Sequence, residues 1–310
     1  MANKSVNFEA QVLKGVVRYH QFNEAFEMIE KLHKLTMNGS AAGGILFGEP
    51  GVGKTTCIKE YERSFTEKHS INKLEQPLVV IEFTKRTSVN SMLRSIIYAL
   101  GGTPPSRNTE DMLIHQCEKL IKNKKVLMIF IDEAQNLLSG LKGVDTEGVF
   151  DTLKSLMNKS NVSIVLSGLP HVKTVFGKLP ATKRDLRRRF KHSSELKAFS
   201  VESWSDFQSF VSALTKGIPM KETELRTKEF HKALLLATKG NQHEVASIFV
   251  EALGSRVDDQ EELDWECFRE AVCYFDMEIN PFDMKSEEVN SCLANWVLLQ
   301  KKAEKTKAKK

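Results

Sequence analysis

The segment that most constrains this chain is Gly48-Glu49-Pro50-Gly51-Val52-Gly53-Lys54-Thr55, which matches G-x-x-x-x-G-K-[ST] at every fixed position. A short apolar run precedes it, and residues 56–68 after it carry side chains at helical spacing. Glycines let backbone N–H groups approach phosphate oxygens, and a helix N-terminus adds partial positive charge. The alternative is a chance glycine turn between a strand and a helix. The complete motif in this context predicts a nucleotide-binding site.

Within this loop, Lys54 is expected to reach the β- and γ-phosphates of ATP, and the Thr55 hydroxyl to ligate Mg²⁺. The expected cofactors are therefore ATP and Mg²⁺. The predicted nucleotide contacts of the loop are Gly48, Glu49, Pro50, Gly51, Val52, Gly53, Lys54, Thr55 and Thr56.

A pair of carboxylates, Asp132 and Glu133, ends the apolar strand predicted at 126–132. A charge at the tip of a buried strand is costly unless it meets a cation. Asp132 is expected to hold Mg²⁺ through water, and Glu133 to polarise the water that attacks the γ-phosphate. The alternative is a strand that happens to end in acidic turn residues, which the nearby phosphate loop disfavours.

The alternation of strands and helices predicts an α/β fold with a three-layer parallel sheet and helices on both faces. From about residue 202 only helical patterns follow, which predicts a small α-helical lid domain. The predicted strands lie near 43–48, 78–84, 126–132, 162–168 and 194–199. The predicted divisions are a helical lead-in (1–36), an α/β nucleotide-binding core (37–201), a helical lid (202–276) and a tail (277–310).

The bulk composition is typical of a soluble globular protein, with 41% hydrophobic and 27% charged residues in 310. The longest apolar run, 126–131, is far too short to span a membrane. The five cysteines form no C-x-x-C pair, which indicates neither a zinc site nor a disulfide framework. We therefore expect a cytoplasmic protein without a membrane partner.

The net charge of +5 is carried by the C-terminal end, because residues 301–310 hold six lysines and one glutamate. Such an end is either a solvated, frayed terminus or an electrostatic arm for nucleic acid. Basic surface elsewhere must come from uneven distribution of the charges.

The order of these motifs resembles the AAA+ ATPases over roughly residues 15–275. Within them the chain is most similar to the TnsC/TniB group of transposition regulators, to which the phage Mu B protein is related. The segments that carry the resemblance are 48–56, 131–135, Leu166-Ser167-Gly168-Leu169-Pro170, Arg189-Phe190, Lys239-Gly240-Asn241 and Asn280-Pro281-Phe282.

The resemblance implies roles for two further core residues. Ser167 at a strand tip would hydrogen-bond the attacking water or the γ-phosphate; a plain strand-to-turn serine is the alternative. Arg189 ends a run of three arginines that cannot all point the same way, so some pair and some project. Arg189 would reach the γ-phosphate of a neighbouring subunit. A solvated basic cluster or phosphate contacts to nucleic acid are the alternatives.

Residues outside the core also follow from the resemblance. The lead-in to the first strand would cover the adenine through Tyr19, His20 or Phe22, with core packing as the alternative. In the lid, an arginine that touches the γ-phosphate usually follows the glycine-asparagine pair, and here that position is His243. A neutral imidazole lacks a permanent charge, so weaker nucleotide sensing by a partly buried histidine is expected.

Proteins similar to TnsC assemble on duplex DNA as an ATP-dependent ring (hexamer or heptamer) or a filament. The matching DNA-binding residues here are Lys85, Arg86, Thr87, Ser88 and Arg94. Their contacts would be sequence-independent and salt-sensitive, and an ordinary charged loop is the alternative. The implied partners are double-stranded DNA, further copies of this chain, transposase subunits (TnsB/TnsA-like) and a target selector (TniQ/TnsD-like, including an RNA-guided complex).

The leading hypothesis is thus an ATPase that oligomerises on target DNA, recruits the transposase and disassembles on ATP hydrolysis. One alternative is another small AAA+ ATPase, either secretion-linked or a replication loader. The other is an ATP-gated DNA scaffold with negligible hydrolysis, against which the intact Asp132-Glu133 pair argues.

Overall fold

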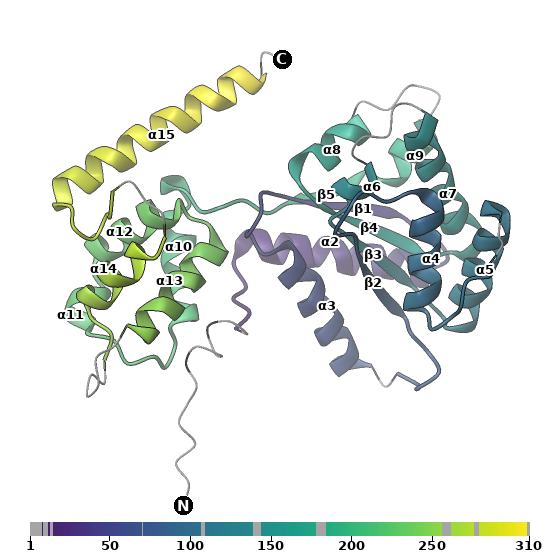
Figure 1. Ribbon diagram of the computed structural model, residues 1–310, viewed down its shortest axis with the longest axis horizontal. Helices are drawn as coiled ribbons and strands as arrows, with labels where there is room; N and C mark the ends of the chain where they lie inside the picture. The colour runs from purple at the N-terminus through teal and green to yellow at the C-terminus, as the bar shows by residue number, and fades with distance from the viewer. Residues whose placement is uncertain are drawn as a thin grey trace, which may run out of the picture. The chain divides into compact units, whose positions relative to one another are not determined.

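The computed structural model describes residues 8, 12, 15–69, 71–106, 109–138, 144–177, 184–255, 262–275 and 279–308. They form two compact units (Figure 1). One is Gln21–Leu196, which holds the sheet; the other combines residues up to His20 with Lys197–Lys310 and contains the later helices. The helix before the first strand thus belongs to the sheet unit.

The sheet has five strands in the order β2-β3-β4-β1-β5, and each adjacent pair is parallel. This confirms the predicted parallel α/β fold. The strands are β1 (Gly43–Phe47), β2 (Leu78–Glu82), β3 (Met128–Asp132), β4 (Ser163–Gly168) and β5 (His192–Glu195). The helices are α2 (His20–Met37), α3 (Lys54–Lys68), α4 (Val89–Ala99), α5 (Glu110–Asn123), α6 (Gln135–Leu138), α7 (Val144–Ser160), α8 (Pro170–Gly177) and α9 (Arg184–Arg189).

Helices cover both faces of the sheet because alternate strand residues point in opposite directions. Ile45, Ile129 and Leu166 belong to one buried cluster with residues of α4, α5 and α7. On the other face, the ring of Phe130 lies 6.1 Å from that of Tyr61 in α3. Figure 1 shows α4, α5 and α7 along one side of the sheet and α3 along the other. The central strands β3 and β4 are buried at every residue.

The last strand is displaced from its predicted position of 194–199 to His192–Glu195. The predicted segment contains apolar Leu196 and Phe199, whereas β5 is a polar strand that, within the described part of the chain, pairs with β1 and no other strand. Its backbone can pair at the sheet edge without an apolar pattern because only one neighbour is needed. Leu196 continues the pairing by donating its N–H to the Phe47 carbonyl, at 2.9 Å.

The second unit is helical, as predicted. Its elements are the 3₁₀ helix η2 (Val201–Ser203), α10 (Trp204–Leu214), α11 (Glu222–Leu225), α12 (Lys228–Thr238), α13 (Gln242–Gly254), α14 (Trp265–Cys273) and α15 (Ser286–Ala308). Phe230, Phe249 and Phe268 pack edge-to-face in its core. The lysine-rich end is helical through Ala308.

Two global expectations concern membranes and cysteines. Among the described residues, no helix is both long and apolar enough to cross a membrane. All five cysteines are free thiols, and three of them are buried.

Candidate nucleotide-binding and hydrolysis site

The phosphate loop connects β1 to α3 in the conformation that its glycines allow. Gly51 and Gly53 have φ angles of 78° and 89°, in the left-handed region that disfavours side chains. Gly48 has no room for a side chain either, since an added Cβ would lie 2.1 Å from the Leu196 carbonyl oxygen. The loop therefore brings its backbone to the first turn of α3, whose N–H groups lack helical partners.

Lys54 lies folded under this loop. Its ammonium donates to the carbonyl oxygens of Gly48 (2.9 Å) and Glu49 (2.8 Å), and only 6% of the residue is exposed. Burial lowers the pKa of Lys54, against the opposing effect of Glu133, Asp132 and Glu49. A buried cation held by neutral carbonyls favours an anionic partner, which the phosphates of a nucleotide would supply.

Asp132 is the centre of the polar network at the carboxyl end of the sheet. The Thr55 hydroxyl donates to its Oδ2 at 2.6 Å, and the Ser167 hydroxyl donates to its Oδ1 at 2.7 Å. The Glu133 N–H also donates to Oδ1, at 2.9 Å. Asp132 is 2% exposed, so these donors stabilise a buried carboxylate.

The oxygen ligands at this point fit Mg²⁺. Mg²⁺ is typically held by one or two protein oxygens together with substrate phosphates and water. The hydroxyl of Thr55 and the carboxylate of Asp132, the two residues expected as metal ligands, are in direct contact beside the phosphate loop. The structure places Ser167 on Asp132, so its hydroxyl orients the carboxylate.

Glu133 follows Asp132 with a φ of 52°, which is unusual for a residue with a side chain. Its carboxylate accepts a hydrogen bond from the side-chain amide of Gln135. The other end of that amide, Oε1, accepts from the N–H of Leu169 at 3.1 Å. No role was assigned to Gln135 from the sequence. Its position two residues after Glu133 is the feature of the sequence from which a contact with Glu133 could have been predicted.

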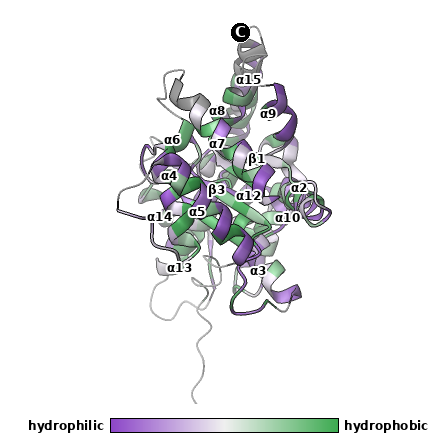
Figure 2. Ribbon diagram, turned by 90° about the vertical axis from the view of Figure 1, so that its right-hand side faces the viewer, coloured by the Kyte–Doolittle hydropathy of each residue, from purple (hydrophilic) through white to green (hydrophobic). Residues whose placement is uncertain are grey.

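Arg189 ends α9, a helix that Figure 2 shows as strongly hydrophilic. Its guanidinium donates to the carbonyl of Ala41, at 3.4 Å. Ala41 precedes β1 and the phosphate loop follows it, and a five-residue strand spans roughly 16 Å. Arg189 therefore lies near the amino end of β1, whereas the phosphate loop of its own chain lies at the carboxyl end of that strand.

The neighbouring arginines diverge, as predicted for three consecutive basic residues. Arg187 donates to the Gly177 carbonyl at 3.1 Å, and Arg188 lies 3.7 Å from Asp185. The side chains of Arg187 and Arg188 are therefore directed toward different partners.

Comparison with known proteins agrees with this geometry. Residues 37–176 match the family model described as AAA domain. Over these residues, which make up less than half of its length, the chain is similar to AAA domains. Residues of this chain are 27% identical over 148 positions to the putative ORC1-type DNA replication protein 1 of Thermoplasma acidophilum, covering 46% of this chain. The match spans 39% of the length of that relative.

Solved structures show the same AAA+ fold. The Cdc6p structure from Pyrobaculum aerophilum superposes with a TM-score of 0.63 at 12% identity, covering 84% of this chain and 70% of that one. The Aeropyrum pernix ORC1 protein in complex with DNA gives 0.59 at 13% identity, covering 86% and 69%. At such low identity the likeness shows the fold alone.

The loop that follows β2 contains most of the candidate DNA-binding residues. Lys85 and Arg86 are exposed. Thr87 is 8% exposed, its hydroxyl donates to the Lys85 carbonyl at 2.7 Å, and its N–H donates to the Asn136 carbonyl. Ser88 caps α4 by accepting from Ser91 N–H, and Arg94 is half-buried on that helix. Lys85 and Arg86 are therefore the exposed cations of this set, and Ser88 is exposed beside them.

Tyr19 and His243 lie in the helical unit, not in the unit that holds the sheet. Tyr19 is 7% exposed and packs edge-on against Phe199 at 5.0 Å, and its hydroxyl accepts from Gln242 at 3.2 Å. His243 is exposed near the start of α13, whereas a partly buried histidine was expected. The expectation was wrong: Asn241 caps the helix by accepting from the His243 N–H, and α13 turns Gln242 inward but leaves His243 exposed.

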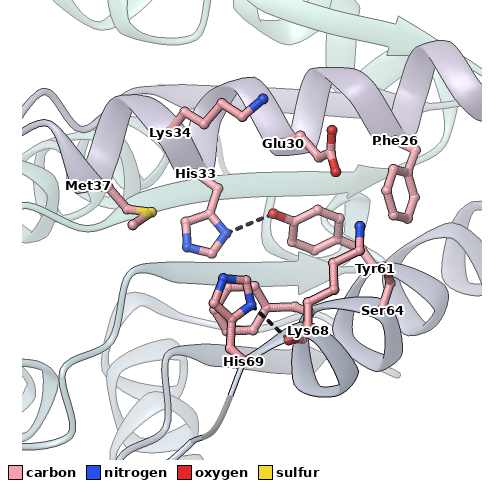
Figure 3. Close-up of a pocket in the computed structure, with 10 residues that line it drawn as sticks. Phe26, Glu30, His33, Lys34, Met37, Tyr61, Ser64, Lys68 and His69 are labelled. Atoms are coloured by element: carbon pink, nitrogen blue, oxygen red, sulfur yellow. Dashed lines mark hydrogen bonds between the residues drawn. The ribbon is translucent and has the colours of Figure 1, made fainter.

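A separate cavity of about 140 Å³ lies between α2 and α3 (Figure 3). In it, Nδ1 of His33 is 2.7 Å from the Tyr61 hydroxyl, and Nε2 has no hydrogen-bond partner among the described residues. Burial, followed by the charge of His69, lowers the pKa of His33, and Glu30 opposes this. Burial also raises the pKa of Tyr61. The pair therefore links α2 to α3 in uncharged form.

Proposed function

We propose that this chain is an ATP-dependent DNA-binding AAA+ ATPase that oligomerises on duplex DNA and regulates DNA transposition. The observation that carries the nucleotide part is the contact of Thr55 and Ser167 with the buried carboxylate of Asp132, beside the loop that holds Lys54. Each of these groups has the chemistry needed around a magnesium-bound triphosphate.

ATP hydrolysis would be divided among these residues. Lys54 would neutralise charge on the β- and γ-phosphates, and Thr55 with Asp132 would hold Mg²⁺, which draws charge from the phosphate oxygens. Glu133 would accept a proton from the attacking water, since it follows the metal-binding carboxylate directly. Ser167 keeps Asp132 in position through its 2.7 Å hydrogen bond.

Assembly would be head-to-tail. Arg189 and the phosphate loop lie at opposite ends of β1, so Arg189 is suited to contact a nucleotide bound to the next subunit. Contacts between different surfaces of identical subunits generate rings when the rotation closes and filaments when it does not. The expected oligomer is therefore a hexameric or heptameric ring, or a filament, bound together by ATP.

DNA would be contacted through Lys85 and Arg86, the exposed cations of the loop after β2. Lysine and arginine contacts to phosphates are independent of base sequence and weaken with salt. A protein of the same fold, the Aeropyrum pernix ORC1 protein, was solved in complex with DNA. This likeness supports DNA as a ligand of the present chain.

The protein partners of the oligomer are proposed from the resemblance to TnsC/TniB proteins. The oligomer on target DNA would recruit and activate TnsB/TnsA-like transposase subunits after a TniQ/TnsD-like selector, including an RNA-guided one, had chosen the site. A replication loader is the second candidate, because the curated relative is named an ORC1-type DNA replication protein.

Electron microscopy of the full chain with duplex DNA, Mg²⁺ and a non-hydrolysable ATP analogue tests the assembly. DNA-threaded rings or filaments are expected for the wild-type chain, and Lys54→Ala should abolish them together with nucleotide-dependent DNA binding. Unchanged ATP-dependent binding by Lys54→Ala would refute the placement of the site. Activation of a purified transposase by these assemblies supports the first candidate, and loading of a replicative helicase supports the second.

A further inference from the structure

The cavity of about 140 Å³ between α2 and α3 lies apart from the nucleotide site. Its walls come from α2 between Phe26 and Met37 and from the end of α3. Lys54 and Lys68 are the first and last residues of α3, and a rise of 1.5 Å per residue separates them by about 21 Å. Lys68 lines the cavity, whereas Lys54 lies under the phosphate loop. A ligand in this cavity would therefore not touch the nucleotide.

The hydrogen bond between His33 and Tyr61 decides which imidazole nitrogen carries the proton. Burial lowers the pKa of His33 and raises the pKa of Tyr61, so both groups are neutral at pH 7.5. If Nδ1 donated, the phenolic hydrogen of Tyr61 and the lone pair on Nε2 would both lack partners among the described residues. If Tyr61 donates, only one group lacks a partner. Tyr61 therefore donates to Nδ1, and Nε2 of His33 carries the N–H.

This N–H is a buried donor without an acceptor. His33 is 4% exposed, and no described residue accepts from Nε2. Such groups are rare in folded proteins because they lose their hydrogen bonds to water. Figure 3 shows Nε2 on the side of the ring away from Tyr61, toward the end of the cavity where Met37 and His69 lie. Met37 is 64% exposed, so its side chain can move aside and admit an acceptor to Nε2.

The remaining walls indicate the chemistry of that acceptor. The ring of Phe65 lies 4.7 Å from that of His33, and Phe26 packs edge-on against Tyr61 at 5.2 Å, so much of the wall is aromatic. Two lysines, Lys34 and Lys68, line the cavity together with one carboxylate, Glu30. Glu30 precedes Lys34 by four residues, a spacing at which opposite charges on a helix compensate each other. The lining therefore combines aromatic surface with a net positive charge and an unpaired N–H.

We propose that this cavity is a binding site for a small aromatic carboxylate. The carboxylate accepts from Nε2–H of His33, the charges of Lys34 and Lys68 favour it, and the ring packs on the aromatic wall. Charge-assisted hydrogen bonds of this kind are stronger than those between neutral groups. The proposal goes beyond the proposed function, because the site uses none of the residues assigned to ATP or DNA.

The test titrates benzoate into the full chain with ¹⁵N-labelled histidine at pH 7.5 and follows the imidazole nitrogens by NMR. We expect Nε2 of His33 to carry the proton before benzoate is added, and its resonance to move as one benzoate binds with a Kd of about 1 mM or below. Benzamide has the same shape without the charge and should bind at least about 10-fold more weakly. A proton on Nδ1, equal affinity for benzamide, or no saturable binding of benzoate would overturn the proposal.

Matched variants separate the donor from the rest of the wall, with the folding of each checked by thermal unfolding. His33→Gln keeps an N–H near the position of Nε2 and should bind benzoate within a few-fold of the wild type. His33→Asn is too short to reach that position and should raise the Kd at least about 10-fold. Lys68→Met should raise the Kd a few-fold, whereas Lys59→Met, exposed on α3 outside the cavity, is the control and should leave it unchanged. Equal Kd values for the two His33 variants would refute the role of Nε2–H.

Discussion

The contact between Ser167 and Asp132 gives a prediction whose size can be estimated from the structure. Ser167 is fully buried, and its hydroxyl is one of three donors to a carboxylate that is 2% exposed. Ser167→Ala removes this donor without leaving room for a replacement. A hydrogen bond to a charged group contributes about 1.5–3 kcal/mol, so the free energy of unfolding of the sheet unit should fall by that amount.

Thermal unfolding measured without nucleotide provides the assay, and a loss of this size corresponds to a fall in Tm of about 3–12 °C for a unit of this length. Ser160→Ala is the matched control, because the Ser160 hydroxyl is buried and finds no hydrogen-bond partner in the part of the chain that the structure describes. Removing an unsatisfied hydroxyl should leave stability unchanged or raise it. Equal Tm values for the two variants would refute the role of Ser167 as a donor to a buried carboxylate.

Three other predictions follow from the site and the cavity. Glu133→Gln should retain ATP but lower kcat by about 10²–10⁴, as loss of a general base does, and unimpaired phosphate release would contradict its role. Arg189→Ala should lower oligomer formation and should lower kcat by up to about 10³–10⁵, as loss of an arginine that acts in trans does. Isolated subunits of this variant should bind ATP normally, and loss of ATP binding by monomers would exclude the role in trans. His33 should contribute to stability fully above its ordinary pKa of 6.5 and progressively less as the pH falls, because the folded state lowers its pKa. His33→Gln should therefore show a smaller fall in Tm between pH 7.5 and 5.5 than the wild type, and an identical pH dependence would be the contrary result.

The residues of the phosphate loop and the strand ends could be predicted because their chemistry is local. A glycine loop between a strand and a helix has few conformations, and parallel strands bring their carboxyl ends to one edge. Asp132 and Ser167 therefore meet although they are far apart in the chain. His243 and the last strand were misplaced, because cap geometry and edge pairing leave little trace in hydrophobic periodicity.

Gln135 and His33 were not predicted as functional residues. Their contacts depend on which segments the fold places side by side, β4 beside the turn after β3 and α3 beside α2. A single polar side chain gives no periodic signal, and the partners here are distant in sequence. Only the packed structure shows Gln135 joined to Leu169, and His33 joined to Tyr61 in a cavity.

The amino-acid sequence by itself determined the phosphate loop, the acidic strand end and the alternation that produces a parallel sheet, because each depends on neighbouring residues. The tertiary structure decided that Ser167 supports Asp132, that Arg189 lies near the amino end of β1, and that His33 meets Tyr61 in a cavity between two helices. These relations arise from strand order and side-chain packing, and both depend on residues that are distant along the chain.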